Sequence, residues 1–383
     1  MTVLVGLMSG TSLDGISAAV VRFTESDGAI APDLLGYLTK PYTPEQRERL
    51  STALIGGNGA IYSRLEFDLG AWLADAAVAV IAEAGVARAD IAAIASHGHT
   101  IWHDPPRASW QIGNPSVIAE RTGVAVVSDF RARDIAAGGQ GAPLVAISDA
   151  MMFSSPTEWR ATLNLGGIAN VQLLPPGGVL ESVRAFDTGP GIGILDSIVR
   201  ALVPGAPYDV DGALARRGAA IPVVLDELLK HQFFSAAPPK STGRELFSAE
   251  YANHLIEECR RMSPGCTSED IIATCTLFTA RSIARAFEHF IPEPVAEVLV
   301  AGGGAKNPAL FGAIRTELEQ LARKTNSRVP KILPFEELYF DGEAKEAVAF
   351  AFLGWLHLQK RAGNVPGATG ARGPRILGSC TPA

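Results

Sequence analysis

The feature that most constrains this chain is a pattern of strand, glycine-rich turn and strand that occurs near its start and again near its middle. In the first copy, apolar, β-forming runs at residues 3–8 and 16–23 flank a segment that ends in Asp14-Gly15. In the second copy, residues 161–174 turn at Gly166-Gly167. Asp-Gly between apolar runs is a strong hairpin signal. We therefore expect two related halves, each opening with a glycine-tipped hairpin.

The tips of these hairpins have two interpretations. Backbone N–H groups and hydroxyls that converge at a turn can bind phosphate oxygens. The first tip consists of Gly10, Thr11, Ser12, Leu13, Asp14 and Gly15. It is not a Walker A loop, because no Gly-Lys-Ser/Thr follows. An ordinary polar turn explains the same residues, so the pattern alone leaves both interpretations open. In a fold of two related halves, the two tips would face each other across a cleft.

Length and composition limit the classes of protein to be considered. A chain of 383 residues, 47% hydrophobic and 19% charged, suits two well-packed domains. A formal net charge of -7 and the lack of any Lys/Arg block argue against nucleic-acid binding. We expect no membrane partner, because no apolar run is long enough to span a bilayer, and the N-terminus does not resemble a signal peptide. The expected compartment is the cytoplasm.

One carboxylate occupies a position that would suit a catalytic group. Residues 180–186 predict a strand, which delivers Asp187 onto the turn Thr188-Gly189-Pro190-Gly191. Glycine allows a ligand to approach the backbone closely, and proline fixes φ near about -65°. The competing interpretation is a tight turn in which the aspartate bonds its own backbone. The turn by itself does not decide between them.

Other polar side chains also follow predicted strands. His97 and His99 come after the strand at residues 91–95, and His103 follows soon after. Because no matching set of Cys, Asp or Glu accompanies them, we expect hydrogen bonding to the structure or a substrate in preference to metal binding. Asp129 and Arg131 end another strand. They could clamp an anionic or polyhydroxy substrate, form a buried ion pair, or do both.

The second half contains a third glycine loop and two helices of interest. Gly302, Gly303 and Gly304 follow the predicted strand 295–301, and Asn307 with Pro308 predicts the start of a helix. This arrangement suits an adenine–ribose unit lying against backbone. The amphipathic helix at residues 268–290 presents an apolar stripe that is either core or dimer surface. A later helix, at residues 343–361, carries Glu346.

Together these features resemble the bacterial anhydro-N-acetylmuramic acid kinase family. The matching segments are GLMSGTSLDG (6–15), SHGHT (96–100), QIGNP (111–115), DFRARDIAAGGQGAPL (129–144), NLGGIANV (164–171), FDTGPG (186–191), PKSTGRELF (239–247), VAGGGAKN (300–307), EAVAFA (346–351) and TGARGPRILG (369–378). The resemblance implies a two-domain α/β fold of the actin/hexokinase-like (ribonuclease H-like) type with a central nucleotide cleft. We expect domain I at residues 1–132 plus 350–383 and domain II at 133–349.

The resemblance also implies a reaction: ATP, Mg²⁺ and water convert 1,6-anhydro-N-acetylmuramic acid into N-acetylmuramic acid 6-phosphate and ADP, in cell-wall sugar recycling. It implies that Asp187 is the general base and that Glu346 is a second catalytic acidic group. It implies that residues 10–15 bind the β/γ-phosphates, with Asp14 near the metal, and that Asn164, Gly166 and Gly167 form the facing phosphate loop. It further places Gly302, Gly303, Gly304 and Asn307 near adenosine, and His97, Asp129 and Arg131 at the sugar. A homodimer is expected.

The chain departs from the family pattern at three places. His99 stands where the family has Gln, Ile192 stands where it has Asn, and residues 145–149 differ from the usual continuation. These changes bear on substrate preference more than on phosphoryl transfer. A kinase for another 1,6-anhydro sugar, such as levoglucosan, is therefore an alternative. A more distant one is an actin-like, nucleotide-gated protein without kinase activity.

Overall fold

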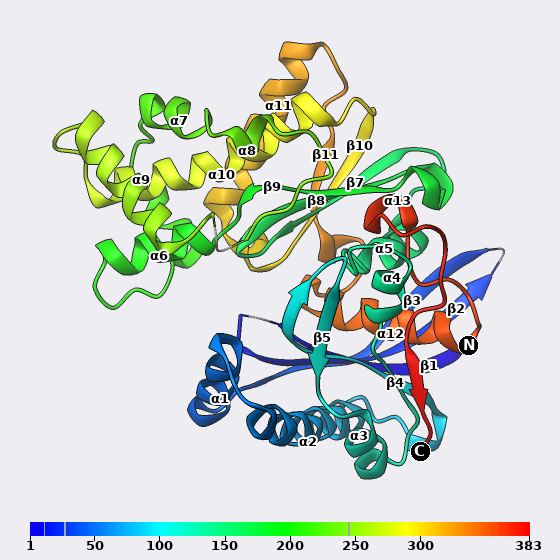
Figure 1. The fold of residues 1–383 in the computed structure, drawn as a ribbon. Helices are drawn as coiled ribbons and strands as arrows, with labels where there is room; N and C mark the ends of the chain where they lie inside the picture. The colour runs from blue at the N-terminus through cyan, green and yellow to red at the C-terminus, as the bar shows by residue number, and fades with distance from the viewer. Residues whose placement is uncertain (11, 27, 244–245) are drawn as a thin grey trace. The chain divides into compact units, whose positions relative to one another are not determined.

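The computed structural model describes residues 1–383 except Thr11, Asp27, Arg244 and Glu245. The chain divides into two compact units (Figure 1). Unit 1 consists of residues 1–154, 178–183 and 344–383, and unit 2 consists of residues 155–177 and 184–343. No helix in the described part of the chain is long and apolar enough to cross a membrane.

Unit 1 is built on one mixed sheet. Its strands are β1 (Thr2–Ser9), β2 (Gly15–Ser26), β3 (Ala29–Pro41), β4 (Ile91–Asp104), β5 (Ala108–Ile112), β6 (Val126–Ser128) and β12 (Ser379–Thr381). They lie in the order β12-β6-β4-β1-β2-β3, and β5 pairs with β4. Strands β1, β2 and β3 are antiparallel neighbours, whereas β4 runs parallel to β1, and β6 runs parallel to β4.

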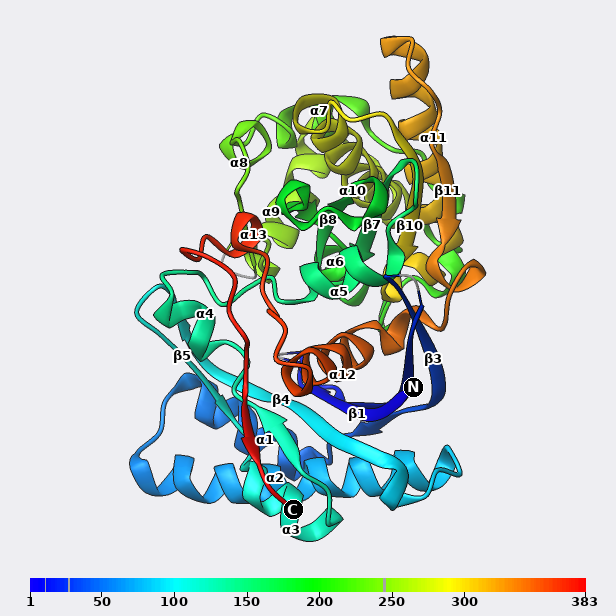
Figure 2. The ribbon, with the colours of Figure 1, turned by 90° about the vertical axis from the view of Figure 1, so that its right-hand side faces the viewer.

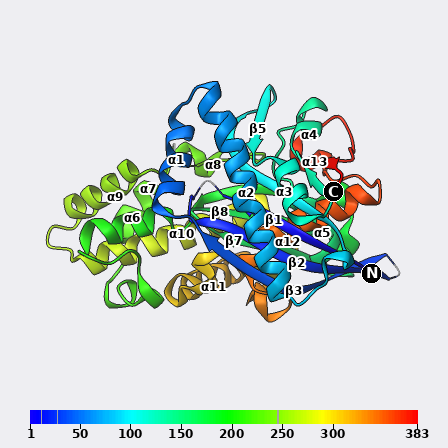
Figure 3. The same ribbon diagram turned by 90° about the horizontal axis from the view of Figure 1, so that it is seen from below.

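Helices cover both faces of this sheet. The helices of unit 1 are α1 (Pro44–Ile55), α2 (Gly59–Glu83), α3 (Pro115–Thr122), α4 (Ala132–Ala136), α5 (Val145–Phe153), α12 (Lys345–Leu358) and α13 (Pro366–Thr369). Helix α2 crosses one face (Figure 3), where Leu65, Leu69 and Leu73 are buried against the strands. Helix α12 packs on the other side and approaches so closely that a Cβ at Gly6 would lie 1.8 Å from the Ala347 carbonyl oxygen. Each large apolar side chain buried here contributes about 1.5–3 kcal/mol.

Unit 2 is built on a second sheet with the same order of strands. Its strands are β7 (Trp159–Leu165), β8 (Ile168–Leu174), β9 (Arg184–Pro190), β10 (Val295–Ala301) and β11 (Lys331–Pro334). They lie in the order β11-β10-β7-β8-β9. Strands β7, β8 and β9 are antiparallel neighbours, and β10 and β11 continue the sheet in parallel. The order therefore matches that of β6-β4-β1-β2-β3 in unit 1.

The helices of unit 2 form a cluster beside its sheet (Figures 1 and 2). They are α6 (Gly193–Leu202), α7 (Pro222–Leu228), α8 (Gln232–Ser235), α9 (Ala249–Met262), α10 (Ser268–Phe290) and α11 (Pro308–Thr325). The apolar stripe of α10 is buried in this unit, with Ile271, Cys275 and Phe278 fully enclosed. The stripe is therefore core, and the interpretation of it as a dimer surface was wrong.

In each sheet, the first three strands in sequence are antiparallel neighbours. Two further strands extend the sheet in parallel beside the first of these three. This duplication confirms the two-domain α/β fold of the actin/hexokinase-like type, with a glycine-tipped hairpin at the start of each sheet. Two helix starts are confirmed as well. Asn307 caps α11 by accepting from the N–H groups of Ala309 and Leu310, and Thr267 caps α10.

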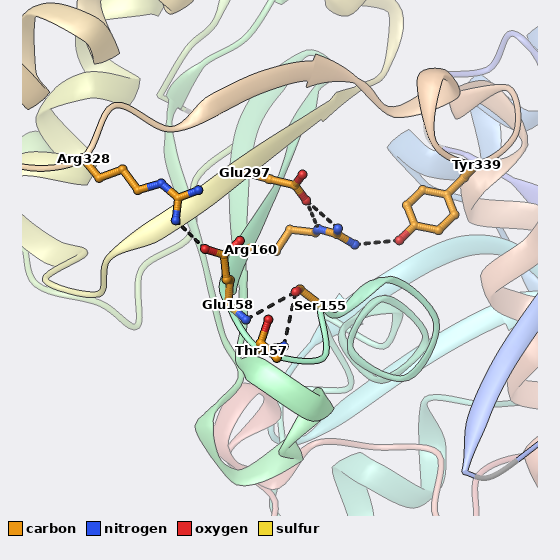
Figure 4. A network of polar contacts seen from close by, with 7 residues as sticks. All are labelled: Ser155, Thr157, Glu158, Arg160, Glu297, Arg328 and Tyr339. Carbon is orange, nitrogen blue, oxygen red and sulfur yellow. Dashed lines mark hydrogen bonds and ion pairs between the residues drawn. The ribbon is translucent and has the colours of Figure 1, made fainter.

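A polar network fixes the middle of the second sheet (Figure 4). Arg160 on β7 donates to Glu297 on β10 at 2.9 and 2.5 Å, and to the Tyr339 hydroxyl at 2.7 Å. At the start of β7, Glu158 pairs with Arg328, and the Ser155 hydroxyl accepts from the Glu158 backbone N–H. Because Arg160 and Glu297 are mostly shielded from water, this pair is less screened than the surface pairs.

A second network ties the C-terminal segment to unit 1. The Asp134 carboxylate on α4 is fully buried and accepts from Asn364 at 2.7 Å, from the Thr369 hydroxyl at 2.8 Å, and from the Gly141 N–H at 2.8 Å. Gly139 packs against the same carboxylate, because a Cβ there would lie 2.2 Å from Oδ2. Asp134 therefore joins two segments that are far apart in the sequence, residues 134–141 and 364–369.

Replacing Asp134 with alanine should lower the stability of unit 1 by about 3 kcal/mol or more, because several buried donors lose a charged acceptor. Urea denaturation of the full chain measures this change. The exposed Asp104→Ala is the matched control and should change stability by less than about 0.5 kcal/mol. Equal stability of the two variants would contradict the assigned role of Asp134.

Candidate active site

In unit 2, the hairpin register lines up polar side chains on one face of the sheet. Asn164 on β7 lies opposite Asn170 on β8, and Asn170 lies opposite Asp187 on β9. Directly opposed residues of antiparallel strands point to the same face. The three residues therefore form a cross-strand row that ends in the carboxylate of Asp187.

Asp187 lies within a strand and not in the turn that the sequence predicts. Strand β9 begins at Arg184, later than expected, and continues through Pro190. A register shift interrupts the β8–β9 ladder between Ala169 and Asn170, opposite Thr188. Bulges of this kind re-aim side chains and are frequent beside active sites. The proline and glycines are accommodated because β9 is at the edge of the sheet.

The 239–243 segment holds Asp187 from its free side. The Asp187 backbone N–H donates to the Lys240 carbonyl at 3.1 Å. The Thr242 N–H donates in turn to Oδ2 of the Asp187 carboxylate at 2.7 Å. Both the main chain and the side chain of Asp187 are therefore fixed by one short segment, which also covers part of the sheet edge.

Three glycine segments come together in unit 2. The N–H groups of Gly191 and Gly193 donate to the Gly167 carbonyl at 3.1 and 3.2 Å. A Cβ at Gly302 would lie 2.7 Å from the Asn164 side-chain oxygen, so the 302–304 loop lies against the end of β7. A Cβ at Gly167 would meet no atom within 4 Å. The backbone of this tip is thus accessible to a ligand, as a phosphate loop requires.

Two residues near these loops have clear packing roles. Ile192, where the family has Asn, lies against Gly303 and Gly304; their added Cβ atoms would be 3.4 and 2.9 Å from its side chain. Asn307 caps α11 and also donates to the Asp209 carbonyl at 3.4 Å. Its expected contact with adenosine stays a prediction.

In unit 1, the first glycine tip is anchored from several sides. Thr11 lies outside the described residues, but the turn around it is closed by a Leu13 N–H bond to the Gly10 carbonyl at 3.2 Å. The Ser12 hydroxyl donates to the exposed Asp14 carboxylate at 2.8 Å. Arg47, near the start of α1, donates to the Leu13 carbonyl at 3.0 Å. The described residues of this tip, Gly10 and residues 12–15, are therefore tied to one another and to α1.

Behind this tip lies a buried polar chain. The Ser9 hydroxyl contacts the Tyr42 hydroxyl at 2.6 Å and Nδ1 of His99 at 2.7 Å. His99 is fully buried, and its Nε2 has no partner in the described part of the protein. Burial lowers the pKa of His99 to about 4, so the ring is neutral at pH 7. The residue that departs from the family pattern thus supports the base of the tip.

His97 and Arg131 form a second polar pair in unit 1. Arg131 Nε donates to His97 Nε2 at 3.0 Å, and Arg131 Nη1 donates to the Gly141 carbonyl at 2.5 Å. Burial, followed by the charge of Arg131, lowers the pKa of His97 well below its usual value. A neutral ring that donates from Nδ1 to the Gly98 carbonyl, 3.0 Å away, can accept from Arg131. The ring also packs on Phe350.

Asp129 and Glu346 complete the predicted residues of unit 1. Asp129 is exposed and has φ 59, an uncommon conformation for a residue with a side chain. Glu346, in the first turn of α12, has a raised pKa. The Glu346 side chain is exposed to solvent, but burial by the surrounding protein atoms is the largest cause of its raised pKa. The positive charge of Arg131 opposes this shift, and the negative charge of Asp14 adds to it. The charges of Asp14 and Arg131 therefore both act on the carboxyl group of Glu346.

Sequence reasoning assigned no role to four residues that take part in these arrangements: Ser9, Tyr42, Asn170 and Thr242. All but Tyr42 lie within the segments that resemble the family. Asn170 could have been found, because a hairpin that turns at residues 166–167 places it opposite Asn164. Tyr42 could not, because it lies between β3 and α1, outside the segments that resemble the family. Thr242 meets Asp187 only through the tertiary fold.

Acid should destabilise this protein partly through His99. The unfolded ring binds a proton below about pH 6.5, whereas the folded ring resists protonation until about pH 4. Stability is therefore present above pH 6.5 and is lost as the pH falls toward 4. His99→Gln should reduce the loss of unfolding free energy between pH 7 and pH 5 by about 2 kcal/mol. Urea denaturation at both pH values measures it; equal losses in the two proteins would contradict the assignment.

Comparison with solved structures gives low similarity. The activator of the 2-hydroxyisocaproyl-CoA dehydratase from Clostridium difficile with bound ADPNP is 15% identical, with a TM-score of 0.44, and the match covers 94% of this chain and 97% of the other. A ROK hexokinase from Thermus thermophilus is 16% identical, with a TM-score of 0.38, over 92% of this chain and 98% of the other. We draw no functional conclusion from similarity at this level.

Comparison of sequences is decisive. A kinase of Caldanaerobacter subterraneus subsp. tengcongensis named anhydro-N-acetylmuramic acid kinase is 40% identical over 98% of this chain and 96% of its own length. A protein of the same name from Xanthomonas axonopodis pv. citri is 41% identical over 99% and 97%. The family model described as anhydro-N-acetylmuramic acid kinase matches residues 2–383. This chain therefore belongs to the anhydro-N-acetylmuramic acid kinase family.

Proposed function

We propose that Asp187 is the general base in the reaction of this ATP-dependent kinase. In that reaction water opens the 1,6-anhydro ring of 1,6-anhydro-N-acetylmuramic acid, and O6 accepts the γ-phosphoryl group of ATP. The products are N-acetylmuramic acid 6-phosphate and ADP. The observation that carries the proposal is the fixed carboxylate of Asp187, held by the Thr242 N–H at 2.7 Å at the end of the polar row on sheet β7-β8-β9.

The chemistry of the anhydro ring explains the need for a base. O6 is an ether oxygen bonded to C1, so it has no proton to lose. The attacking water must lose a proton while the C1–O6 bond breaks and the bond between water oxygen and C1 forms. Asp187 takes that proton, and O6 leaves with the electron pair that attacks the γ-phosphorus. General-base catalysis of this kind contributes about 10²–10⁴-fold.

Backbone groups of the glycine loops suit the nucleotide. We assign the accessible Gly166-Gly167 tip, together with residues 10–15 of unit 1, to the phosphates. The 302–304 loop is assigned to adenosine. Phosphoryl transfer depends mainly on positioning and charge neutralisation, and N–H groups at such turns supply both without a titratable group.

Asp14 and Glu346 fit a magnesium ion, because Mg²⁺ prefers oxygen ligands and is commonly held by one or two carboxylates with substrate phosphates. Both side chains are exposed, and the negative charge of Asp14 contributes to the raised pKa of Glu346. A bound Mg²⁺ would neutralise charge on the transferred phosphoryl group. We assign Asp14 to the metal and Glu346 to the water bound to it.

His97, Asp129 and Arg131 are assigned to the sugar. N-acetylmuramic acid carries a lactyl carboxylate, and a guanidinium is well suited to binding carboxylates. Arg131 remains a cation at neutral pH even though burial lowers its pKa to about 10. Its bonds to His97 and Gly141 fix the orientation of the guanidinium.

Two further expectations concern the compartment and the oligomeric state. We place the reaction in the cytoplasm, where ATP is supplied. We also propose a homodimer, as the family resemblance implies, but α10 does not provide its surface, because the apolar stripe of that helix is buried within unit 2.

Asp187→Asn should lower kcat by about 10²–10⁴-fold and leave ATP binding intact, because the amide keeps the shape but cannot accept the proton. Release of ADP and mass analysis of product made in ¹⁸O-water measure the effect; wild-type product should carry the label at C1. Asp226→Asn, on an exposed part of α7, is the control. Near-normal turnover of Asp187→Asn would remove Asp187 from this role.

Asp14→Ala should raise KM for MgATP by about tenfold and lower kcat, because a charged contact at the metal is worth roughly 1.4 kcal/mol or more. Titration of turnover against ATP and against Mg²⁺ separates the two effects. Unchanged KM and kcat would contradict the assignment of residues 10–15 to the phosphates.

A further inference from the structure

Lys240 is held in an unusual environment in unit 2. Its ammonium lies 4.7 Å from the ring centroid of Phe233 and 4.5 Å from that of Phe290, so two aromatic faces contact one cation. The same ammonium donates to the Phe233 carbonyl at 3.0 Å. These three contacts come from α8 and from the end of α10. They fix the tip of a long side chain that would be mobile on a free surface.

The backbone of Lys240 is fixed as well, and it leads directly to Asp187. Its carbonyl accepts from the Asp187 N–H at 3.1 Å. Two residues later, the Thr242 N–H donates to the Asp187 carboxylate at 2.7 Å, although these residues are 55 positions apart in the sequence. In the described residues, the 239–243 segment contains no helix or strand of its own. Its position against β9 therefore depends on anchors such as the Lys240 side chain.

The charges around Lys240 also link it to Asp187. Its pKa is lowered to about 8, first by burial and then by the charge of Arg285 on α10, while Asp187 on β9 opposes the shift. The side chain is therefore mainly cationic at pH 7, and its charge and that of Asp187 attract each other.

We propose that Lys240 is a positioning residue for Asp187: its clamped ammonium anchors the 239–243 segment, whose backbone holds the main chain and the carboxylate of Asp187 in place. The proposal rests on the role of Asp187 as general base. In this proposal Lys240 acts through Asp187. Small errors in the placement of a reacting group cost about 10²-fold in rate, so such an anchor has a measurable effect.

The test compares Lys240→Met with Lys240→Arg in the full chain. Methionine keeps length and apolar contact but removes the cation, and arginine keeps a cation that can contact both rings. Lys240→Met should lower kcat by about tenfold to a hundredfold. KM for ATP should change by less than about twofold, because the glycine loops are untouched. Lys240→Arg should restore part of kcat. Lys331→Met, on an exposed site of β11, is the matched control.

A double-mutant cycle with Asp187→Asn distinguishes positioning from packing. If Lys240 acts through Asp187, adding Lys240→Met to Asp187→Asn should slow the residual reaction by less than about twofold. The same factor in both backgrounds would overturn the proposal, and so would wild-type kcat in Lys240→Met. Thr242→Pro, which deletes the N–H donor to the carboxylate, is a second variant and should show the same non-additivity; additive loss there would also overturn it.

The two proposals fail in different ways. Near-normal turnover of Asp187→Asn would reject the general base, whatever Lys240 does. An inactive Asp187→Asn combined with a fully active Lys240→Met would reject only the anchor. Melting temperatures of all variants are measured in parallel, so that loss of rate through unfolding is recognised.

Discussion

The candidate site of unit 2 depends on the hydrogen-bond ladder between β8 and β9. This ladder places Asn170 opposite Asp187, and its register shift beside Thr188 lets an aspartate and a glycine-proline sequence share one edge strand. Without the shift, every side chain beyond it would point to the opposite face. The row of Asn164, Asn170 and Asp187 lies on the regular side of this shift, where Asn170 pairs directly with Asp187, and Asp187 is held from outside by the 239–243 segment.

The glycine loops depend on close approach of backbone to backbone. A Cβ at Gly191 would lie 2.0 Å from the Gly166 carbonyl oxygen, which excludes any larger residue without movement of the chain. Ile192 fills the adjoining space against the 303–304 loop. Where the family has a polar amide, this chain thus has an apolar contact between two loops.

In unit 1, burial determines the protonation state of two histidines. His97 and His99 are both enclosed, and exclusion of water keeps both rings neutral at pH 7. A neutral His97 can accept from Arg131, which leaves the guanidinium as the cation of this pair. A neutral His99 joins Ser9 and Tyr42 behind the first tip. The same residue type thus accepts a hydrogen bond from a buried cation at one position and contacts a hydroxyl at the other.

The sequence by itself determined the features that depend on neighbours in the chain. Asp14-Gly15 and Gly166-Gly167 predict hairpins, and Asn307 with Pro308 predicts a helix start, because turn and cap preferences are local. The repeat of the hairpin pattern also predicts a duplicated fold. Only the tertiary structure decided that Asp187 lies in a strand, that Tyr42 meets Ser9, and that Lys240 lies beside Asp187. These contacts join residues far apart in sequence, and no local pattern encodes which distant backbone will fill a given edge.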